Sequence, residues 1–114
     1  MKLLLLLSIA FAKEVGLQTQ EILDTMNRNV GPIARCYERE LKTYPALEGR
    51  MITDIEIDRR GKVLKALVES SDLGNEELEK CVTDTVLKLQ FPKPRGKVAV
   101  RVRYPFRFTQ NLKR

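Results

Sequence analysis

Lys97-Val98-Ala99-Val100-Arg101-Val102-Arg103-Tyr104-Pro105-Phe106-Arg107-Phe108 is the stretch that decides the fold, because apolar side chains alternate with mostly basic ones along it. A period of two is typical of a β-strand with one buried face. The apolar face holds Val98, Val100, Val102, Tyr104, Phe106 and Phe108. Proline has no N–H for a strand ladder, so Pro105 indicates a strand at the edge of its sheet.

A hairpin is predicted upstream of this strand. Residues 49–58 alternate in the same way, and Met51, Thr53, Ile55 and Ile57 share one face. The turn at residues 58–61 contains Gly61, which can adopt a positive φ. Residues 63–70 then form the returning strand.

Two helical segments are also predicted. Over residues 18–42, apolar side chains recur three or four positions apart. Gly31-Pro32 interrupts this pattern, and a kink or break is expected near residues 29–31 because proline removes a helical hydrogen bond; Pro32 could also begin a second helical piece. A second helix is expected after Asn75, which is a plausible N-cap. Its apolar face holds Leu78, Cys81, Val82, Val86 and Leu89.

The order helix, strand, strand, helix, strand predicts an α+β fold with two layers. A helix joins the second and third strands, and a right-handed crossover makes such strands parallel. The first strand can lie between them, antiparallel to both. The expected sheet therefore has three strands in the order 2-1-3, with two helices on one face.

Residues 1–12, Met-Lys-Leu-Leu-Leu-Leu-Leu-Ser-Ile-Ala-Phe-Ala, are interpreted as a short export signal. Lys2 supplies a basic start, an apolar run follows, and Ala10-Phe11-Ala12 resembles a cleavage site. The segment is too short to cross a bilayer. The alternatives are a remnant of a longer signal or anchor, and a buried helix. We expect residues 13–114 to form a single domain.

Cys36 and Cys81 are the only cysteines. Because small exported domains commonly carry disulfides, and both residues lie on helices expected on one side of the sheet, we predict that they pair. The alternative is two buried free thiols. The absence of a Cys-x-x-Cys motif argues against a thioredoxin-like role.

Composition argues against enzymatic chemistry. The chain has 114 residues, a net charge of +6 and no histidine, so it lacks the usual general base and the commonest transition-metal ligand. No catalytic triad or nucleotide-binding motif occurs. Asp54, Glu56 and Asp58 are expected to lie on a solvated face, because no further acidic cluster accompanies them. We therefore expect no catalytic residue, metal or cofactor.

From about Ile33 to Phe108 the chain resembles TonB C-terminal domains, and more closely their AgmX/PglI C-terminal type. The matching stretches include Cys36-Tyr37-Glu38, Leu47-Glu48-Gly49-Arg50, Val68-Glu69-Ser70-Ser71, Leu78-Glu79-Lys80-Cys81-Val82 and Tyr104-Pro105-Phe106. The resemblance implies a non-enzymatic periplasmic module that binds proteins and is associated with envelope energy transduction, transport or gliding-type machinery. A TonB domain accepts a short receptor segment as a strand on its last strand. Carried over to this sequence, the partner-binding edge consists of Val98, Val100, Arg101, Val102, Arg103, Tyr104 and Arg107.

Such an edge offers free main-chain groups to a periplasmic or outer-membrane peptide segment. Arg101, Arg103 and Arg107 would favour an acidic segment. The alternative is that these charges and Pro105 protect the edge from aggregation. From the sequence, proline at Val100 or Val102 is expected to weaken partner binding by removing a donor.

A second possible function is a small basic domain that binds nucleic acid or anionic lipid. Against nucleic acid, aromatic platforms interleaved with basic residues on one exposed face are missing. Contact with a membrane is expected only if the N-terminus is uncleaved or longer. Arg59-Arg60 is expected to be an exposed hairpin tip, with contact to anionic lipid as the alternative.

Overall fold

The computed structural model describes residues 15–110. The predicted export signal lies outside these residues. Within them, the elements in chain order are α2 (Thr19–Arg28), α3 (Val30–Leu41), β1 (Gly49–Ile57), β2 (Val63–Ser71), α4 (Glu76–Leu87) and β3 (Val100–Phe108).

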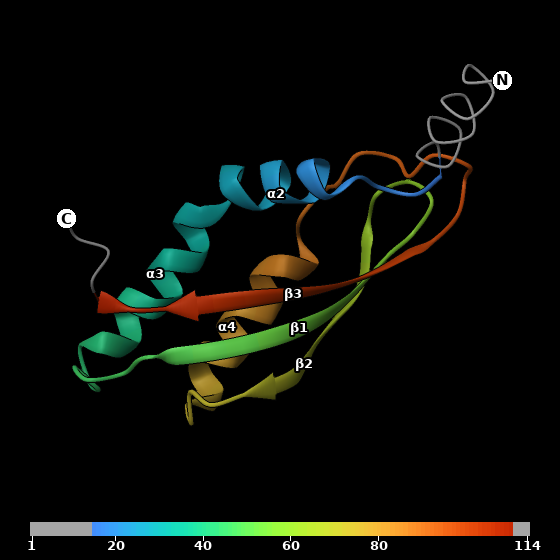
Figure 1. Ribbon diagram of the computed structural model, residues 1–114. Helices are drawn as coiled ribbons and strands as arrows, with labels where there is room; N and C mark the ends of the chain where they lie inside the picture. Colours follow the sequence, from blue (N-terminus) through green and yellow to red (C-terminus); the bar gives the residue numbers. More distant parts are fainter. Residues whose placement is uncertain (1–14, 111–114) are drawn as a thin grey trace, which may run out of the picture.

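The strands form one sheet in the order β2-β1-β3, and α3 and α4 cover one of its faces (Figure 1). Both neighbouring pairs are antiparallel, so β2 and β3 run in the same direction on either side of β1. The predicted α+β fold and strand order are confirmed. Among residues 15–110, no helix covers the other face, which is called the open face below (Figure 1).

The first predicted helix is divided in two, so the described residues contain three helices where two were expected. Pro32 cannot donate to the carbonyl of Arg28, and its ring crowds that carbonyl. The break falls at Asn29, whose N–H donates to Met26 (3.0 Å) and whose side-chain amide donates to the Thr25 carbonyl (2.7 Å). Pro32 is accommodated in the first turn of α3, where helical N–H groups have no intrahelical partner.

The hairpin turn depends on Gly61, which has a φ of +87°. A Cβ atom here would collide with the carbonyl of Phe91, whose N–H donates to the Gly61 carbonyl at 2.9 Å. Asp58 completes the turn, since its Oδ1 accepts the N–H groups of Arg60 (2.8 Å) and Lys62 (2.9 Å). These hydrogen bonds, that from Lys62 first, lower the pKa of Asp58.

The core lies between the sheet and α3 and α4. The predicted apolar faces of the first strand and of the second helix supply its centre. The completely buried side chains of these two faces are Met51, Thr53, Ile55, Ile57, Leu78, Val82 and Val86. Asn75 caps α4 as predicted, because its Oδ1 accepts the N–H of Leu78 at 2.8 Å. None of the helices within residues 15–110 is both long and apolar enough to cross a membrane.

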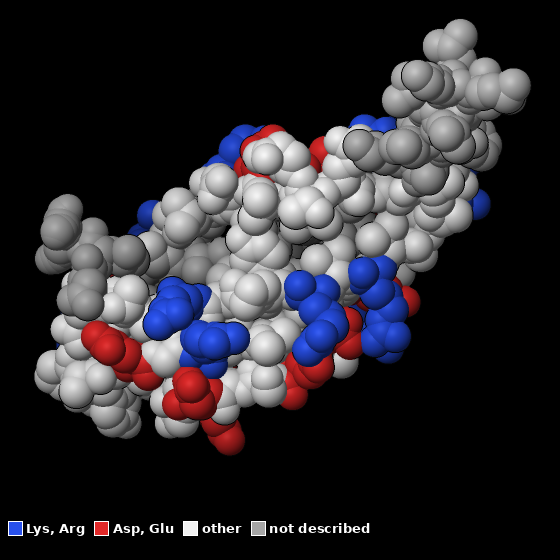
Figure 2. Space-filling model, viewed as in Figure 1, with Lys and Arg blue, Asp and Glu red and all other residues white. Residues whose placement is uncertain are grey.

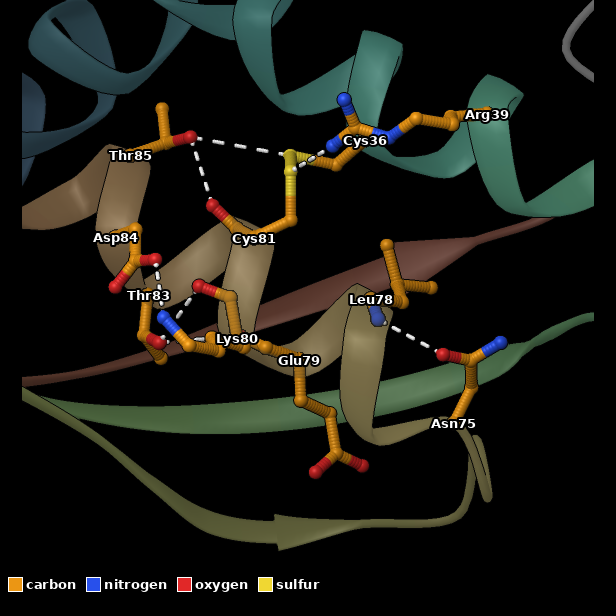
Figure 3. Close-up of a disulfide and its surroundings, with 10 residues drawn as sticks. All are labelled: Cys36, Arg39, Asn75, Leu78, Glu79, Lys80, Cys81, Thr83, Asp84 and Thr85. Carbon is orange, nitrogen blue, oxygen red and sulfur yellow. Dashed lines mark hydrogen bonds and ion pairs between the residues drawn. A yellow bond between two sulfur atoms is a disulfide. The ribbon is translucent and has the colours of Figure 1, made fainter.

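A disulfide between Cys36 and Cys81 joins α3 to α4, as predicted (Figure 3). Thr85 of α4 lies beside it and donates its hydroxyl hydrogen to the Cys81 carbonyl at 2.8 Å. The Arg39 guanidinium donates to Cys81 Sγ at 2.9 Å. The bridge fixes the helical layer against which the sheet packs.

Candidate functional site: the β3 edge of the sheet

β3 is one of the two outer strands, and it is the more regular of them. It pairs with β1 in an unbroken register from Gly49–Phe108 to Ile57–Val100. The pairing of β1 with β2 has two irregularities. Bulges of this kind bend a strand and hinder the addition of another. Of the two edges, β3 is therefore the better template for an incoming strand.

The hydrogen bonds of Arg50 show which main-chain groups of β3 are free. In an antiparallel ladder, successive residues of a strand direct their N–H and C=O groups to opposite sides. Arg50 bonds on the β2 side, because its N–H donates to Asp72 Oδ1 (2.7 Å) and its C=O accepts the Asp72 N–H (3.1 Å). The odd-numbered residues of β1 therefore face β3, and they pair with even-numbered residues of β3.

The odd-numbered residues of β3, Arg101, Arg103, Pro105 and Arg107, consequently direct their main-chain groups away from the sheet. No main-chain hydrogen bond from elsewhere in residues 15–110 reaches them. The edge thus presents three N–H groups and four carbonyl groups.

This alternation explains why β3 tolerates Pro105, and it corrects the expectation for proline substitutions elsewhere in the strand. The N–H that proline lacks would point to the free edge, so the ladder with β1 loses no bond. Val100 and Val102, by contrast, face β1. Proline at either position would disrupt the sheet rather than block the edge. The strand also begins at Val100 rather than Lys97, because the positive φ of Lys97 (+54°) turns the chain before it. Val98 precedes β3 and is exposed.

Even-numbered side chains of β3 point toward the helices. Phe106 and Phe108 are buried, while Tyr104 is half-buried, and burial raises the pKa of Tyr104. The Phe108 ring centre lies 5.1 Å from that of Tyr37, and the Tyr37 hydroxyl donates to the Leu47 carbonyl at 2.6 Å. The aromatic residues of β3 thus anchor the strand at this end.

Arg101 and Arg103, by contrast, point to the open face and have partners there. Arg101 forms an ion pair with Asp54 at 2.6 Å. Arg103 bonds Glu69 of β2 through two guanidinium nitrogens, at 2.7 and 2.8 Å. These carboxylates raise the pKa values of both arginines. Asp54 is therefore paired, not merely solvated, and two of the three arginines expected to attract an acidic segment are already neutralised.

A set of contacts between Glu21, Gly16 and Arg95, called the clip below, holds α2 beside the loop preceding β3, and no sequence pattern predicts it. Arg95 forms two hydrogen bonds with the Glu21 carboxylate, at 2.9 and 2.8 Å. Gly16 and Arg95 also exchange main-chain hydrogen bonds of 2.8 and 2.9 Å. The Arg95 guanidinium, followed by the Gln18 N–H, lowers the pKa of Glu21 to about 2. The clip places α2 beyond β3, on the side away from β1 (Figure 1).

The hairpin tip and the acidic side chains are the other candidate sites. Arg59, Arg60 and Lys97 gather around an open hollow of about 370 Å³ at the hairpin tip, which forms a basic surface. Within residues 15–110, no three acidic or cysteine side chains are grouped so that they could hold a metal ion.

No known family model and no curated protein matches the sequence. Among solved structures, the solution structure of the TonB C-terminal domain from Helicobacter pylori is similar, with 14% identity and a TM-score of 0.43. The match covers 82% of this chain and 94% of that domain.

Proposed function

We propose that this chain is a non-enzymatic protein-binding module of the bacterial periplasm that accepts an extended partner segment as a fourth strand beside β3. The observation that carries the proposal is the regular outer edge of β3, where the main-chain groups of Arg101, Arg103 and Arg107 have no partner within residues 15–110. Strand addition satisfies such groups and uses alternate side chains for specificity.

The compartment and biological setting are part of the same proposal. A disulfide is compatible with an oxidising location such as the periplasm. The sequence resembles TonB C-terminal domains, and among them the AgmX/PglI type, and this resemblance supports a role in envelope energy transduction, transport or gliding-type machinery. A sequence without histidine agrees with binding rather than catalysis.

Pro105 gives the edge selectivity. A partner carbonyl placed opposite Pro105 would find no donor, and an unpaired carbonyl is costly once it is removed from water. The edge therefore favours registers in which the partner avoids this pairing. On the helical side, half-buried Leu17 and Ile22 pack against the core near α2 and would meet apolar side chains of the added strand.

The test begins with peptides selected from a random library for binding to the oxidised domain. Addition of a selected peptide is expected to slow amide hydrogen exchange at Arg101, Arg103 and Arg107, measured by NMR. Arg103→Pro removes one outward donor without removing a ladder bond, and Arg103→Ala is its matched control because both variants lose the ion pair with Glu69. We expect Arg103→Pro to bind about tenfold more weakly than Arg103→Ala.

Equal binding by the folded Arg103→Pro and Arg103→Ala variants would contradict strand addition. So would peptides that bind without slowing exchange at the three arginine amides. The selected peptides could instead bind only at the hairpin tip formed by Arg59, Arg60 and Lys97, and be displaced by oligonucleotides or anionic vesicles. That result would favour binding of nucleic acid or anionic lipid.

A further inference from the structure

Arg50 of β1 and Arg107 of β3 are directly opposite each other in the sheet. Arg50 turns its main-chain groups toward β2, so this is a pair without hydrogen bonds between the two residues. Cα atoms in such pairs are only about 4.5 Å apart, and their side chains are the closest in an antiparallel ladder. Both side chains are exposed on the open face. Like charges in this position repel and destabilise a sheet.

The charges of Arg50 and Arg107 are not compensated as those of their neighbours are. Arg101 and Arg103 on the same face each have a carboxylate partner. The side chains of Arg50 and Arg107 make no hydrogen bond or ion pair within residues 15–110. Figure 2 views this face of the sheet, where basic side chains gather beside acidic ones over β3 and β1.

The two arginines border an open hollow of about 560 Å³ at the end of β3. Two carboxylates also line it, but main-chain groups hold them. Asp72 Oδ1 accepts the Arg50 N–H at 2.7 Å, and a Cβ atom on Gly49 would collide with this oxygen. Glu48 accepts the Gln110 N–H at 3.3 Å. The hollow thus combines two guanidinium groups that have no partner within residues 15–110 with two carboxylates that each accept a main-chain N–H.

We propose that Arg50 and Arg107 together bind a carboxylate, namely an aspartate or glutamate side chain of the strand added to β3. The inference rests on the proposed function and specifies its partner. Guanidinium groups bind carboxylates through paired, charge-assisted hydrogen bonds. A carboxylate between them also replaces their mutual repulsion with attraction.

Strand geometry gives the position of the acidic residue. The outward main-chain groups of Arg107 would bond the partner residue directly opposite, whose side chain then lies on the same open face beside the Arg107 side chain. Arg50 is one strand further away, at about 10 Å between main chains, since neighbouring strands are about 4.8 Å apart. Long side chains of arginine and glutamate cover this separation.

The site can be tested without a partner by NMR of the arginine side-chain Nε–H groups in the oxidised protein. The probes are N-acetyl-glutamate amide, which presents one side-chain carboxylate, its glutamine counterpart and inorganic phosphate. Saturable shifts of Arg50 and Arg107 with the glutamate compound, absent with the glutamine compound, support the proposal. Equal, non-saturable shifts at every arginine would overturn it. Phosphate that binds at least about tenfold more tightly than the glutamate compound would identify a free-anion site instead.

Peptides that protect the β3 edge provide the second test. We expect them to carry aspartate or glutamate at the position opposite Arg107, and to lose about tenfold in affinity when Arg107→Gln or Arg50→Gln is introduced. Replacing the acidic residue of the peptide with its amide should cause no further loss of affinity for these variants. Lys65→Gln is the matched control, because it removes one positive charge from the same face on β2.

The two proposals fail separately. Peptides that protect the edge amides but bind Arg107→Gln as tightly as the original protein would overturn the carboxylate site and leave strand addition intact. Saturable glutamate binding at Arg50 and Arg107, together with peptides that never protect the edge, would sustain the carboxylate site and overturn strand addition.

Discussion

The Cα atoms of Cys36 in α3 and Cys81 in α4 lie 5.8 Å apart, although the two residues are 45 positions apart in the sequence. The chain between these residues includes both β1 and β2, so the disulfide closes a loop around the central strand and one of its neighbours. In a chain of this length, with a modest core, such a link is a large part of the total stability.

We predict that reduction lowers the free energy of unfolding by about 4 kcal/mol, the chain-entropy value for a loop of this length. Urea denaturation with and without reductant measures the effect. The Cys36→Ser, Cys81→Ser double variant is the control and should be as unstable as the reduced protein under both conditions. Identical denaturation midpoints for the oxidised and reduced protein would show that the bridge does not stabilise the fold.

The second prediction is an alternating exchange pattern along β3 in the free protein. Amides of Val102, Tyr104 and Phe106 face β1 and should exchange slowly. Those of Arg101 and Arg103 face outward and should exchange rapidly. Hydrogen exchange followed by NMR distinguishes the two sets residue by residue. Slow exchange at all five positions would mean that the outer edge of β3 is already covered.

The third prediction concerns the facing arginines. Arg50→Glu places opposite charges across the non-hydrogen-bonded pair with Arg107. We expect it to raise the free energy of unfolding by about 0.5 kcal/mol, as cross-strand ion pairs do, and to weaken binding of acidic peptides. Thermal unfolding in low and high salt measures the gain, which salt should reduce. Lys65→Glu controls for the change in net charge. A less stable Arg50→Glu variant would show that the two arginines do not repel in the native state.

Much of the fold is predictable from local patterns. The alternation in residues 49–58 and 97–108 and the capping residue Asn75 indicate elements whose apolar faces can be buried in few ways. The right-handed crossover then makes the second and third strands parallel, which allows the first strand to lie between them. The division between α2 and α3 follows from Pro32, although the pattern leaves open whether proline bends or breaks the helix.

The details of the edge are not predictable in the same way. Which residues of β3 point outward depends on the register with β1, and a shift by one residue reverses the answer. The partners of Arg101 and Arg103 lie on other strands, so their charges appear available in the sequence but are paired in the structure. Arg50 is important only because the register places it opposite Arg107.

The fourth prediction tests the clip between Glu21 and Arg95, which spans 74 positions of sequence and holds α2 beyond the edge strand. The pKa of Glu21 is about 2 in the folded protein, below its ordinary value of 4.5. A carboxylate whose pKa is lowered on folding stabilises the fold at pH values above its ordinary pKa. This contribution disappears as the pH falls through the pKa of the folded state.

Glu21→Gln should therefore be less stable than the original protein near neutral pH, by no more than about 1 kcal/mol because the pair is partly exposed. The difference should shrink as the pH falls below about 4.5 and vanish near pH 2. Thermal unfolding of both proteins across this range measures it. Asp84→Asn, which breaks the exposed pair between Lys80 and Asp84, is the matched control and should leave stability almost unchanged. A Glu21→Gln deficit that persists undiminished near pH 2 would mean that packing of the side chain, rather than its charge, holds α2 in place.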